Sequence, residues 1–267
     1  MKPKPATLEP LDDLRSTASA LLAASGLRPD RAIILANLLL WFDTAGLPDH
    51  GLATLPDLLD RIARGEVDPK AEGKIGPERA ASAVLDGHNG PAPLILARAA
   101  EVATEKAREY GVGLVRVKSI GPIGSAAAVV AEIAIGPAIG VAFGPGGAWS
   151  VALPTAEGLP IVADAVFGSD RAALASFMPW SPLIGVGDWI IQAVSVPALE
   201  PLASFHERVS EFAKGAGGAF LQPDRQEGLR REARERGLSL SSATRSALKD
   251  WAGRHSLAVE KRQPPQR

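Results

Sequence analysis

The first quarter of the chain repeats apolar residues at helical spacing. Segments 11–25, 28–46 and 48–65 each place an apolar residue every three or four positions, which is the period of an amphipathic helix. A glycine stands at the end of each segment, as is typical of helix stops: Gly26, Gly46 and Gly65. The pattern therefore predicts three successive helices, the third beginning at Pro48.

Residues 82–196 follow a different pattern, typical of strands. Short alternating or continuously apolar segments, bounded by Gly and Pro, predict strands at 82–86, 112–117, 139–143, 150–153, 160–164 and 189–196. Helices are predicted at 93–110 and 122–135, and later at 198–213, 224–236 and 241–253. Segment 165–188 is rich in Pro, Gly and Trp and is predicted to be irregular. The sequence thus indicates an α/β (α+β) fold with a mixed sheet.

The predicted elements group into two domains. We expect a helical domain built from both chain ends, residues 1–75 with 198–255, and a sheet-containing domain at 76–197. Residues 256–267 end in Gln-Pro-Pro-Gln-Arg and are predicted to form a disordered tail.

Composition narrows the class of protein. Of 267 residues, 46% are hydrophobic and 22% charged, which fits a soluble globular protein. The net charge of −1 gives no global field for nucleic acid or an acidic membrane. The absence of cysteine excludes disulfides, thiol catalysis and cysteine-based metal sites. The N-terminus has no apolar signal region, and no apolar run reaches the roughly 18 residues of a membrane span, so we expect a cytoplasmic protein.

The C-terminal segment 225–267 is locally basic. Its charges interleave at i,i+3 and i,i+4 spacings, which favours a solvated helix face with ion pairs. A surface for nucleic acid or an acidic partner is the less favoured alternative.

The main candidate for chemistry is Asp49-His50-Gly51, at the corner between two predicted helices. An imidazole at such a corner can donate a proton, and the adjacent Asp49 carboxylate favours its charged form. No histidine–carboxylate pair has metal spacing, so no metal site is predicted. The GxG pairs at 111–113 and 185–187 lack the strand–GxGxxG–helix context of a Rossmann fold and are interpreted as turn glycines.

Several motifs, taken in order, resemble one family. They are the Asp49–Pro56 corner with its helix at 57–69, the Asp86-Gly87-His88-Asn89-Gly90 turn, the helix-then-strand unit 99–117, the paired strands 151–154 and 160–165, and the C-terminal helices at 199–212 and 229–240. Together they resemble the non-Rossmann malate/L-lactate dehydrogenase family, which includes enzymes acting on L-sulfolactate, ureidoglycolate and Δ1-piperideine-2-carboxylate. The resemblance covers roughly residues 8–255.

The resemblance implies a cytoplasmic, homodimeric oxidoreductase of L-sulfolactate dehydrogenase-like fold. It would use NADPH or NADH on a small 2-oxo or 2-hydroxy acid or a cyclic imino acid. By the same resemblance, His50 is expected to donate the proton and Asp49 to orient it. Ser119, Gly121 and Asp164 are expected near the cofactor.

The chain also departs from the family pattern. Asp49 replaces a serine, Thr54 replaces the arginine that clamps a substrate carboxylate, and the second histidine is absent from the turn at 118–124. Lys118 in that turn is interpreted as a strand-end lysine pointing to water, with a substitute cation as the alternative. The loop at 144–147 and segment 165–188 are shorter than usual.

Three functions therefore remain open at this point. One is an active reductase. The second is a catalytically degenerate member that acts as a binding or regulatory subunit, in a homodimer or in a heteromer with an active relative. The third, less favoured, is an enzyme with different chemistry in a remodelled cleft.

Overall fold

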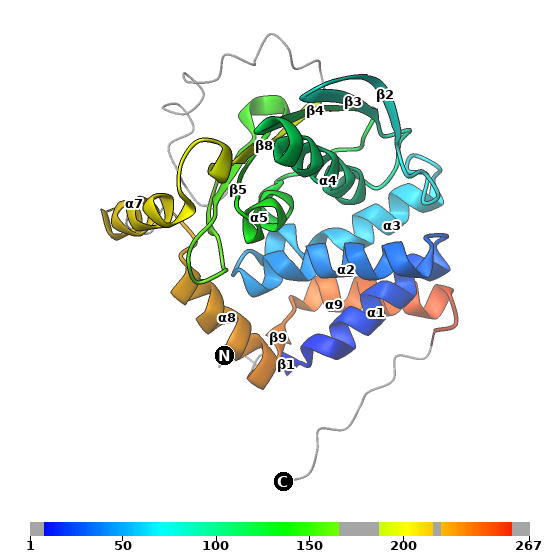
Figure 1. Ribbon diagram of the computed structural model, residues 1–267. Helices are drawn as coiled ribbons and strands as arrows, with labels where there is room; N and C mark the ends of the chain where they lie inside the picture. The colour runs from blue at the N-terminus through cyan, green and yellow to red at the C-terminus, as the bar shows by residue number, and fades with distance from the viewer. Residues whose placement is uncertain (1–7, 166–186, 216–219, 258–267) are drawn as a thin grey trace. The chain divides into compact units, whose positions relative to one another are not determined.

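The computed structural model describes residues 8–165, 187–215 and 220–257 (Figure 1). Contacts divide the chain into two compact units: unit 1 comprises residues 1–70 and 227–267, and unit 2 comprises residues 71–226. The sequence places the second boundary at 197. The structure places it at 226, because Leu221 pairs with Val162 of the sheet and the Gln226 side chain donates to the Pro160 carbonyl oxygen. Most of segment 165–188 and of the predicted tail lies outside the described residues.

Unit 1 is helical. Its elements are β1 (Leu8–Glu9), α1 (Leu11–Ala24), α2 (Pro29–Thr44), η1 (Pro48–His50), η2 (Leu52–Thr54), α3 (Leu55–Ala63), most of α8 (Pro223–Arg236), β9 (Leu238–Ser239) and α9 (Ser242–Arg254). Helices α1 and α2 pack through fully buried leucines, among them Leu21, Leu22 and Leu35. The two-residue strands β1 and β9 pair antiparallel, which the sequence does not predict.

The third predicted helix begins later than expected. The chain forms the turns η1 and η2 before α3 starts at Leu55. Gly51, between the two turns, has φ −92° and ψ −134°, outside the helical region, so a helix from Pro48 cannot continue through it. The predicted start at Pro48 was therefore wrong by one and a half to two turns, and the intervening residues form a sharp corner.

Unit 2 contains a seven-stranded sheet in the order β2-β3-β4-β8-β5-β6-β7. The strands are β2 (Lys74–Arg79), β3 (Ser82–Asp86), β4 (Val112–Lys118), β5 (Ala138–Phe143), β6 (Trp149–Leu153), β7 (Ile161–Asp164) and β8 (Trp189–Ser195). Strands β3 and β4 are parallel and all other neighbours are antiparallel, so the sheet is mixed as predicted. The sequence misses β2, a polar and mostly exposed edge strand interrupted by Pro77.

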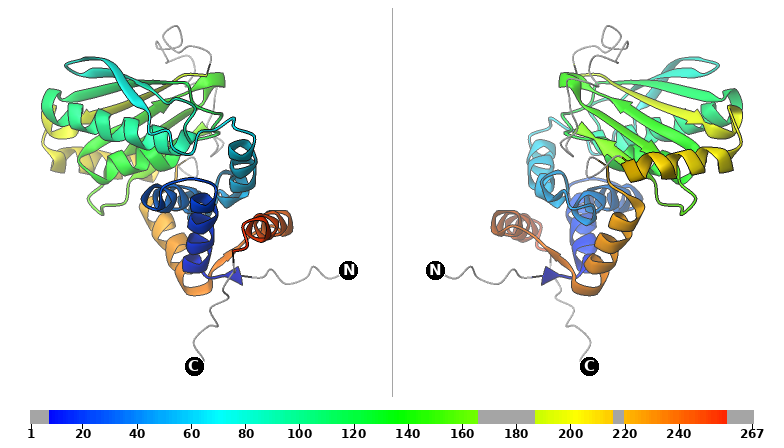
Figure 2. Two further views of the ribbon diagram at one scale, coloured as in Figure 1. Left: turned by 90° about the vertical axis from the view of Figure 1, so that its right-hand side faces the viewer. Right: turned by 90° about the vertical axis from the view of Figure 1, so that its left-hand side faces the viewer.

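Helices α4 (Ala92–Tyr110) and α5 (Ala127–Ile135) cover one face of this sheet (Figure 2). Along β4, Gly113, Val115 and Val117 face these helices and are buried, while Arg116 and Lys118 point to the other face and are exposed. The described part of unit 2 also contains η3 (Pro145–Gly147), η6 (Val196–Ala198) and α7 (Leu202–Gly215). No helix in the described part of the chain is long and apolar enough to cross a membrane.

Gly113 allows helix α4 to lie very close to strand β4. A Cβ placed on Gly113 would overlap the Ala103 carbonyl oxygen of α4 and lie 2.7 Å from the carbonyl carbon. Gly111, by contrast, ends α4 in a left-handed conformation with φ 82°. The interpretation of both residues as turn glycines was thus correct for Gly111 and wrong for Gly113, which lies inside a strand.

Candidate active site

The Asp49-His50-Gly51 corner lies in unit 1, between α2 and α3. Asp49 is exposed and His50 is partly exposed at the end of η1. The His50 ring contacts the Phe42 ring, with centroids 6.0 Å apart. Thr54, at the position of the missing clamp arginine, donates its hydroxyl to the Gly51 carbonyl oxygen at 2.8 Å. Thr54 therefore braces the corner through the corner's own backbone.

A buried carboxylate supports this corner from below. Asp43, in the last turn of α2, is only 9% exposed and accepts the Leu52 N–H at 2.8 Å. A Cβ on Gly51 would overlap one carboxylate oxygen of Asp43 and lie 2.8 Å from the other. The chain thus turns directly over Asp43, and only glycine fits at the point of contact. Asp43 holds the backbone at Leu52, directly after Gly51, and so helps to fix the corner that carries His50.

Burial gives Asp43 an unusual acidity. Desolvation raises its pKa from 3.8 to about 7, against the opposing effect of the Leu52 N–H, which favours the ionised form. Sequence reasoning does not single out this residue. The available signal is its position: Asp43 directly follows the apolar run 33–42 and lies on the same helical face as buried Leu39.

The stability of the protein should therefore depend on Asp43 protonation. A carboxyl group whose pKa is raised on folding contributes stability that is complete below its unfolded pKa, near 4, and is lost as the pH rises through about 7. We expect the free energy of unfolding of Asp43→Asn, relative to that of wild type, to increase by about 2 kcal/mol as the pH rises from 5 to 8. Urea unfolding of both proteins across this range measures the difference. A constant difference would show that Asp43 has an ordinary pKa in the folded protein.

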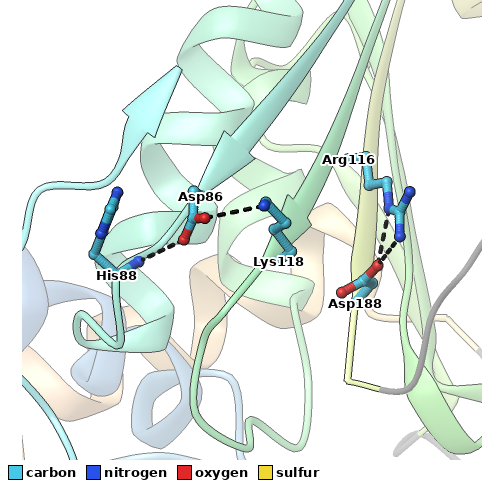
Figure 3. Close-up of polar contacts among 5 residues, drawn as sticks. All are labelled: Asp86, His88, Arg116, Lys118 and Asp188. Atoms are coloured by element: carbon cyan, nitrogen blue, oxygen red, sulfur yellow. Dashed lines mark hydrogen bonds and ion pairs between the residues drawn. The ribbon is translucent and has the colours of Figure 1, made fainter. Parts of the chain in front are cut away.

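A second cluster of polar groups lies in unit 2, at the carboxyl ends of the parallel strands β3 and β4 (Figure 3). Two loops meet there, residues 86–90 and 118–121, which we call the loop pair. The Gly87 N–H donates to the Lys118 carbonyl oxygen and the Asn89 N–H to the Ser119 carbonyl oxygen, each at 2.8 Å. His88 and Asn89 have positive φ values of 48° and 56°, which fixes the first loop as a tight turn. The backbone bonds hold the two loops together.

Asp86 organises the side chains of the loop pair. It accepts the His88 N–H at 3.1 Å and contacts the Lys118 ammonium at 3.1 Å. These partners, with the His88 N–H the strongest, lower its pKa to about 2. Lys118 therefore bonds to Asp86 instead of simply pointing to water, although its side chain stays 45% exposed. Two residues earlier on β4, Arg116 makes a similar ion pair with Asp188 at 2.6 Å, which the sequence does not predict.

The three residues expected near a cofactor all lie in unit 2 but differ in accessibility. Ser119 is exposed, has φ 56° and belongs to the loop pair, and Gly121 follows it with partial exposure. Asp164 is 1% exposed at the end of β7, and its carboxylate accepts the hydroxyls of Ser125, at 2.8 Å, and Ser150. The structure brings Ser119 and Gly121 together at an open edge and places Asp164 in the interior.

Asp164 acts beneath the start of α5. Its two serine partners accept the first free N–H groups of that helix, Ser150 from Ala126 and Ser125 from Ala127. The carboxylate is thus connected through hydroxyls to the positive end of the helix dipole. This bonding explains why α5 begins at Ala127 and not at Pro122 as the sequence predicts.

The other histidines form a turn or contact an aromatic ring, and the Nε2 atoms of His206 and His255 are buried without a hydrogen-bond partner among the described residues. His88 forms the loop-pair turn, and His255 stacks on Trp251 with ring centroids 5.6 Å apart. His206 lies on α7, next to Phe205. Among the described residues, no group of three His, Asp or Glu side chains could hold a metal ion.

A known protein family matches the part of the chain that contains these clusters. The family profile described as malate/L-lactate dehydrogenase matches residues 10–165, which include the His50 corner, the loop pair and Asp164. The chain belongs to the malate/L-lactate dehydrogenase family. The family resemblance inferred from the order of the sequence motifs is thereby confirmed.

Curated members of the malate/L-lactate dehydrogenase family match part of the chain. L-sulfolactate dehydrogenase of Methanocaldococcus jannaschii is 31% identical over 106 residues, which cover 40% of this chain and 31% of that enzyme. Malate dehydrogenase of Pyrococcus abyssi is 33% identical over 110 residues, 41% of this chain and 30% of that enzyme. The ureidoglycolate dehydrogenase (NAD(+)) of Escherichia coli K12 is 22% identical over 200 residues, 68% of this chain and 57% of that enzyme. The first two matches span about a third of each relative's length.

Solved structures show the same fold. Malate dehydrogenase from Entamoeba histolytica superimposes with a TM-score of 0.82 at 16% identity, covering 95% of this chain and 99% of that chain. Sulfolactate dehydrogenase from Methanocaldococcus jannaschii superimposes with a TM-score of 0.78 at 17% identity, covering 95% and 98%. The predicted L-sulfolactate dehydrogenase-like fold is therefore confirmed.

Proposed function

We propose that this protein is an NAD(P)-linked oxidoreductase that interconverts a small 2-oxo acid and its 2-hydroxy acid, or reduces a cyclic imino acid. The observation that carries the proposal is the His50 corner, with its backbone fixed on the buried Asp43. A turn between two helices does not need a buried carboxylate. Because burying the Asp43 carboxylate costs free energy, its presence under the corner suggests that the position of His50 is important. Family membership supplies the class of reaction.

The loop pair fits part of a nucleotide cofactor. Ser119 is exposed, with its side chain bonded to Asp86, and Gly121 gives close access to the backbone. Lys118 keeps ammonium hydrogens beyond its contact with Asp86. These groups would hold a ribose hydroxyl or a phosphate oxygen. Asp164 would act indirectly, by holding Ser125 and the start of α5 in place. When bound, the nicotinamide supplies or accepts the hydride.

Residues of this chain would donate and accept the proton in the reaction. Reduction of a carbonyl or imine places a proton on the heteroatom, and we assign its donation to the His50 imidazolium. Asp49, the adjacent exposed carboxylate, would stabilise that charged ring. Asp43 holds the backbone at Leu52 by a hydrogen bond and makes no hydrogen bond to the His50 ring in the described part of the chain. His50 and Asp49 are therefore the proposed catalytic residues, and Asp43 is a positioning residue.

We further propose that the protein works in the cytoplasm as a homodimer, as expected from its family. NADPH and NADH are both candidates, and the substrate is a small carboxylic acid. Because Thr54 is uncharged and bonded to the backbone, the substrate carboxylate must be held by another cation than the one this position usually provides.

The test of this function is cofactor binding by the purified full-length protein. Titration with NADH and with NADPH, followed by nucleotide fluorescence, is expected to show saturable binding of at least one of them below millimolar concentration. Turnover is then measured on a panel of 2-oxo acids and cyclic imino acids. No binding at millimolar NADH or NADPH would contradict the oxidoreductase proposal and support a degenerate binding or regulatory subunit, for which a partner pull-down is the next experiment.

A further inference from the structure

The loop pair presents a carboxylate and an ammonium group side by side (Figure 3). The Asp86 carboxylate lies 3.1 Å from the Lys118 ammonium, and the two side chains are 28% and 45% exposed. Asp86 and Lys118 are partners in the register of the parallel strands β3 and β4, so both groups stand at the carboxyl ends of these strands. In open α/β sheets, ligands bind outside such ends. The two charged groups are therefore accessible where the proposed cofactor would bind.

Asp86 is ionised and can accept a further hydrogen bond. One of its oxygens accepts the His88 N–H at 3.1 Å, the other contacts Lys118, and the Ser119 side chain is a further partner. These contacts, with the His88 N–H the strongest, lower its pKa to about 2, so the group is a carboxylate at neutral pH. A carboxylate has about four lone-pair sites, which leaves roughly one for a ligand. Lys118 likewise keeps N–H donors beyond its contact with Asp86.

An acceptor beside a donor is complementary to two neighbouring hydroxyl groups. Each hydroxyl can both donate and accept, so one can donate to Asp86 while the next accepts from Lys118. A phosphate group in the same place would carry a charge of about −1.5 to −2 and would act chiefly as an acceptor. It would meet a lysine that is already paired and an ionised carboxylate of like charge, which disfavours binding. The loop pair is therefore suited to a diol and not to a phosphorylated ribose.

We propose that Asp86 and Lys118 bind the adenosine ribose diol of NADH, and that Asp86 makes the site select NADH over NADPH. This inference rests on the proposed function, because it requires a nicotinamide nucleotide at the loop pair. NADH and NADPH differ only in the 2′-phosphate of the adenosine ribose. The ratio of their dissociation constants therefore reports this one contact, whatever the strength of the rest of the site. Asp86 is a specificity-determining residue in this assignment and takes no part in the transfer of hydride or proton.

The experiment measures dissociation constants of NADH and NADPH for the full-length protein by nucleotide fluorescence, at constant ionic strength. Wild type is expected to bind NADH at least tenfold more tightly than NADPH. Asp86→Asn keeps an oxygen that can accept the His88 N–H but removes the charge, and should lower the NADPH-to-NADH ratio of dissociation constants at least fivefold. Lys118→Gln leaves the Asp86 carboxylate without its counter-ion and should raise the same ratio. Thermal unfolding verifies that each variant is folded.

Glu105→Gln is the matched control, because Glu105 is exposed on α4 of the same unit and lies outside the loop pair. It removes an equal charge and should leave the ratio within twofold of wild type. The inference is overturned if wild type binds NADPH as tightly as NADH, if Asp86→Asn changes the ratio less than twofold, or if Glu105→Gln changes it as much as Asp86→Asn. In each of these cases a nucleotide still binds and the proposed function stands. If neither nucleotide binds to wild type, the proposed function fails and this inference fails with it.

Discussion

Gly113→Ala is expected to destabilise unit 2 by about 3 kcal/mol or more, because an overpacked contact between two backbones cannot be relieved by moving a side chain. The added methyl group would overlap the Ala103 carbonyl oxygen and lie 2.9 Å from the Ala103 Cα, so α4 must shift away from β4. Chemical denaturation followed by tryptophan fluorescence measures the loss, since Trp149 and Trp189 are buried in this sheet.

Gly76→Ala is the matched control for this prediction. Gly76 lies in β2 of the same sheet, where a Cβ would make an ordinary 3.6 Å contact with the Val84 carbonyl oxygen. We expect this variant to stay within about 1 kcal/mol of wild type, in the range usual for surface substitutions. Equal stability of Gly113→Ala and Gly76→Ala would refute the close approach of α4 to β4.

His50→Gln is expected to lower kcat by roughly 10² to 10⁴-fold while leaving the dissociation constant of the nucleotide within about threefold of wild type. This is the usual contribution of a positioned general acid, and glutamine keeps hydrogen-bonding capacity but cannot carry the proton. Steady-state kinetics on the best substrate of the panel and nucleotide fluorescence measure the two quantities separately. The pH dependence of kcat should also lose the limb that reports the proton donor.

The control for this prediction is His206→Gln, which replaces a histidine of unit 2 that is distant in sequence from His50 and has no part in the proposed chemistry. His206 is partly exposed on α7 and contacts the Phe205 ring. We expect its kcat to match wild type. If His50→Gln keeps more than a third of wild-type kcat, His50 is not the proton donor, even if the protein proves to be a dehydrogenase.

Periodicity alone predicts most of the elements in this fold. The alternation in 112–117 and the helical spacing in 93–110 locate β4 and α4 to within one residue, because each element buries one regular face. The edge strand β2 escapes prediction because it is exposed on both faces and leaves no apolar pattern. The late start of α3 escapes because a single glycine conformation decides it.

The candidate sites divide in the same way. The histidine of the corner is visible in the sequence because histidines are few: the chain has 4. Asp43 is not, because its role comes from burial and from a hydrogen bond to a residue nine positions later. The loop pair depends on β3 and β4 being parallel neighbours, and local sequence does not specify which strands pair. The Arg116–Asp188 contact joins residues 72 positions apart and depends on β8 lying beside β4.

The buried Asp164 has a consequence for how this scaffold can evolve. Because Asp164 and two serines satisfy the start of α5 from within, the helix needs no ligand anion to be stable. Substitutions in the exposed loop pair, such as those at Ser119 or Lys118, can then alter or abolish ligand recognition without unfolding unit 2. A lineage built in this way can exchange one substrate for another, or lose its chemistry, while its architecture persists.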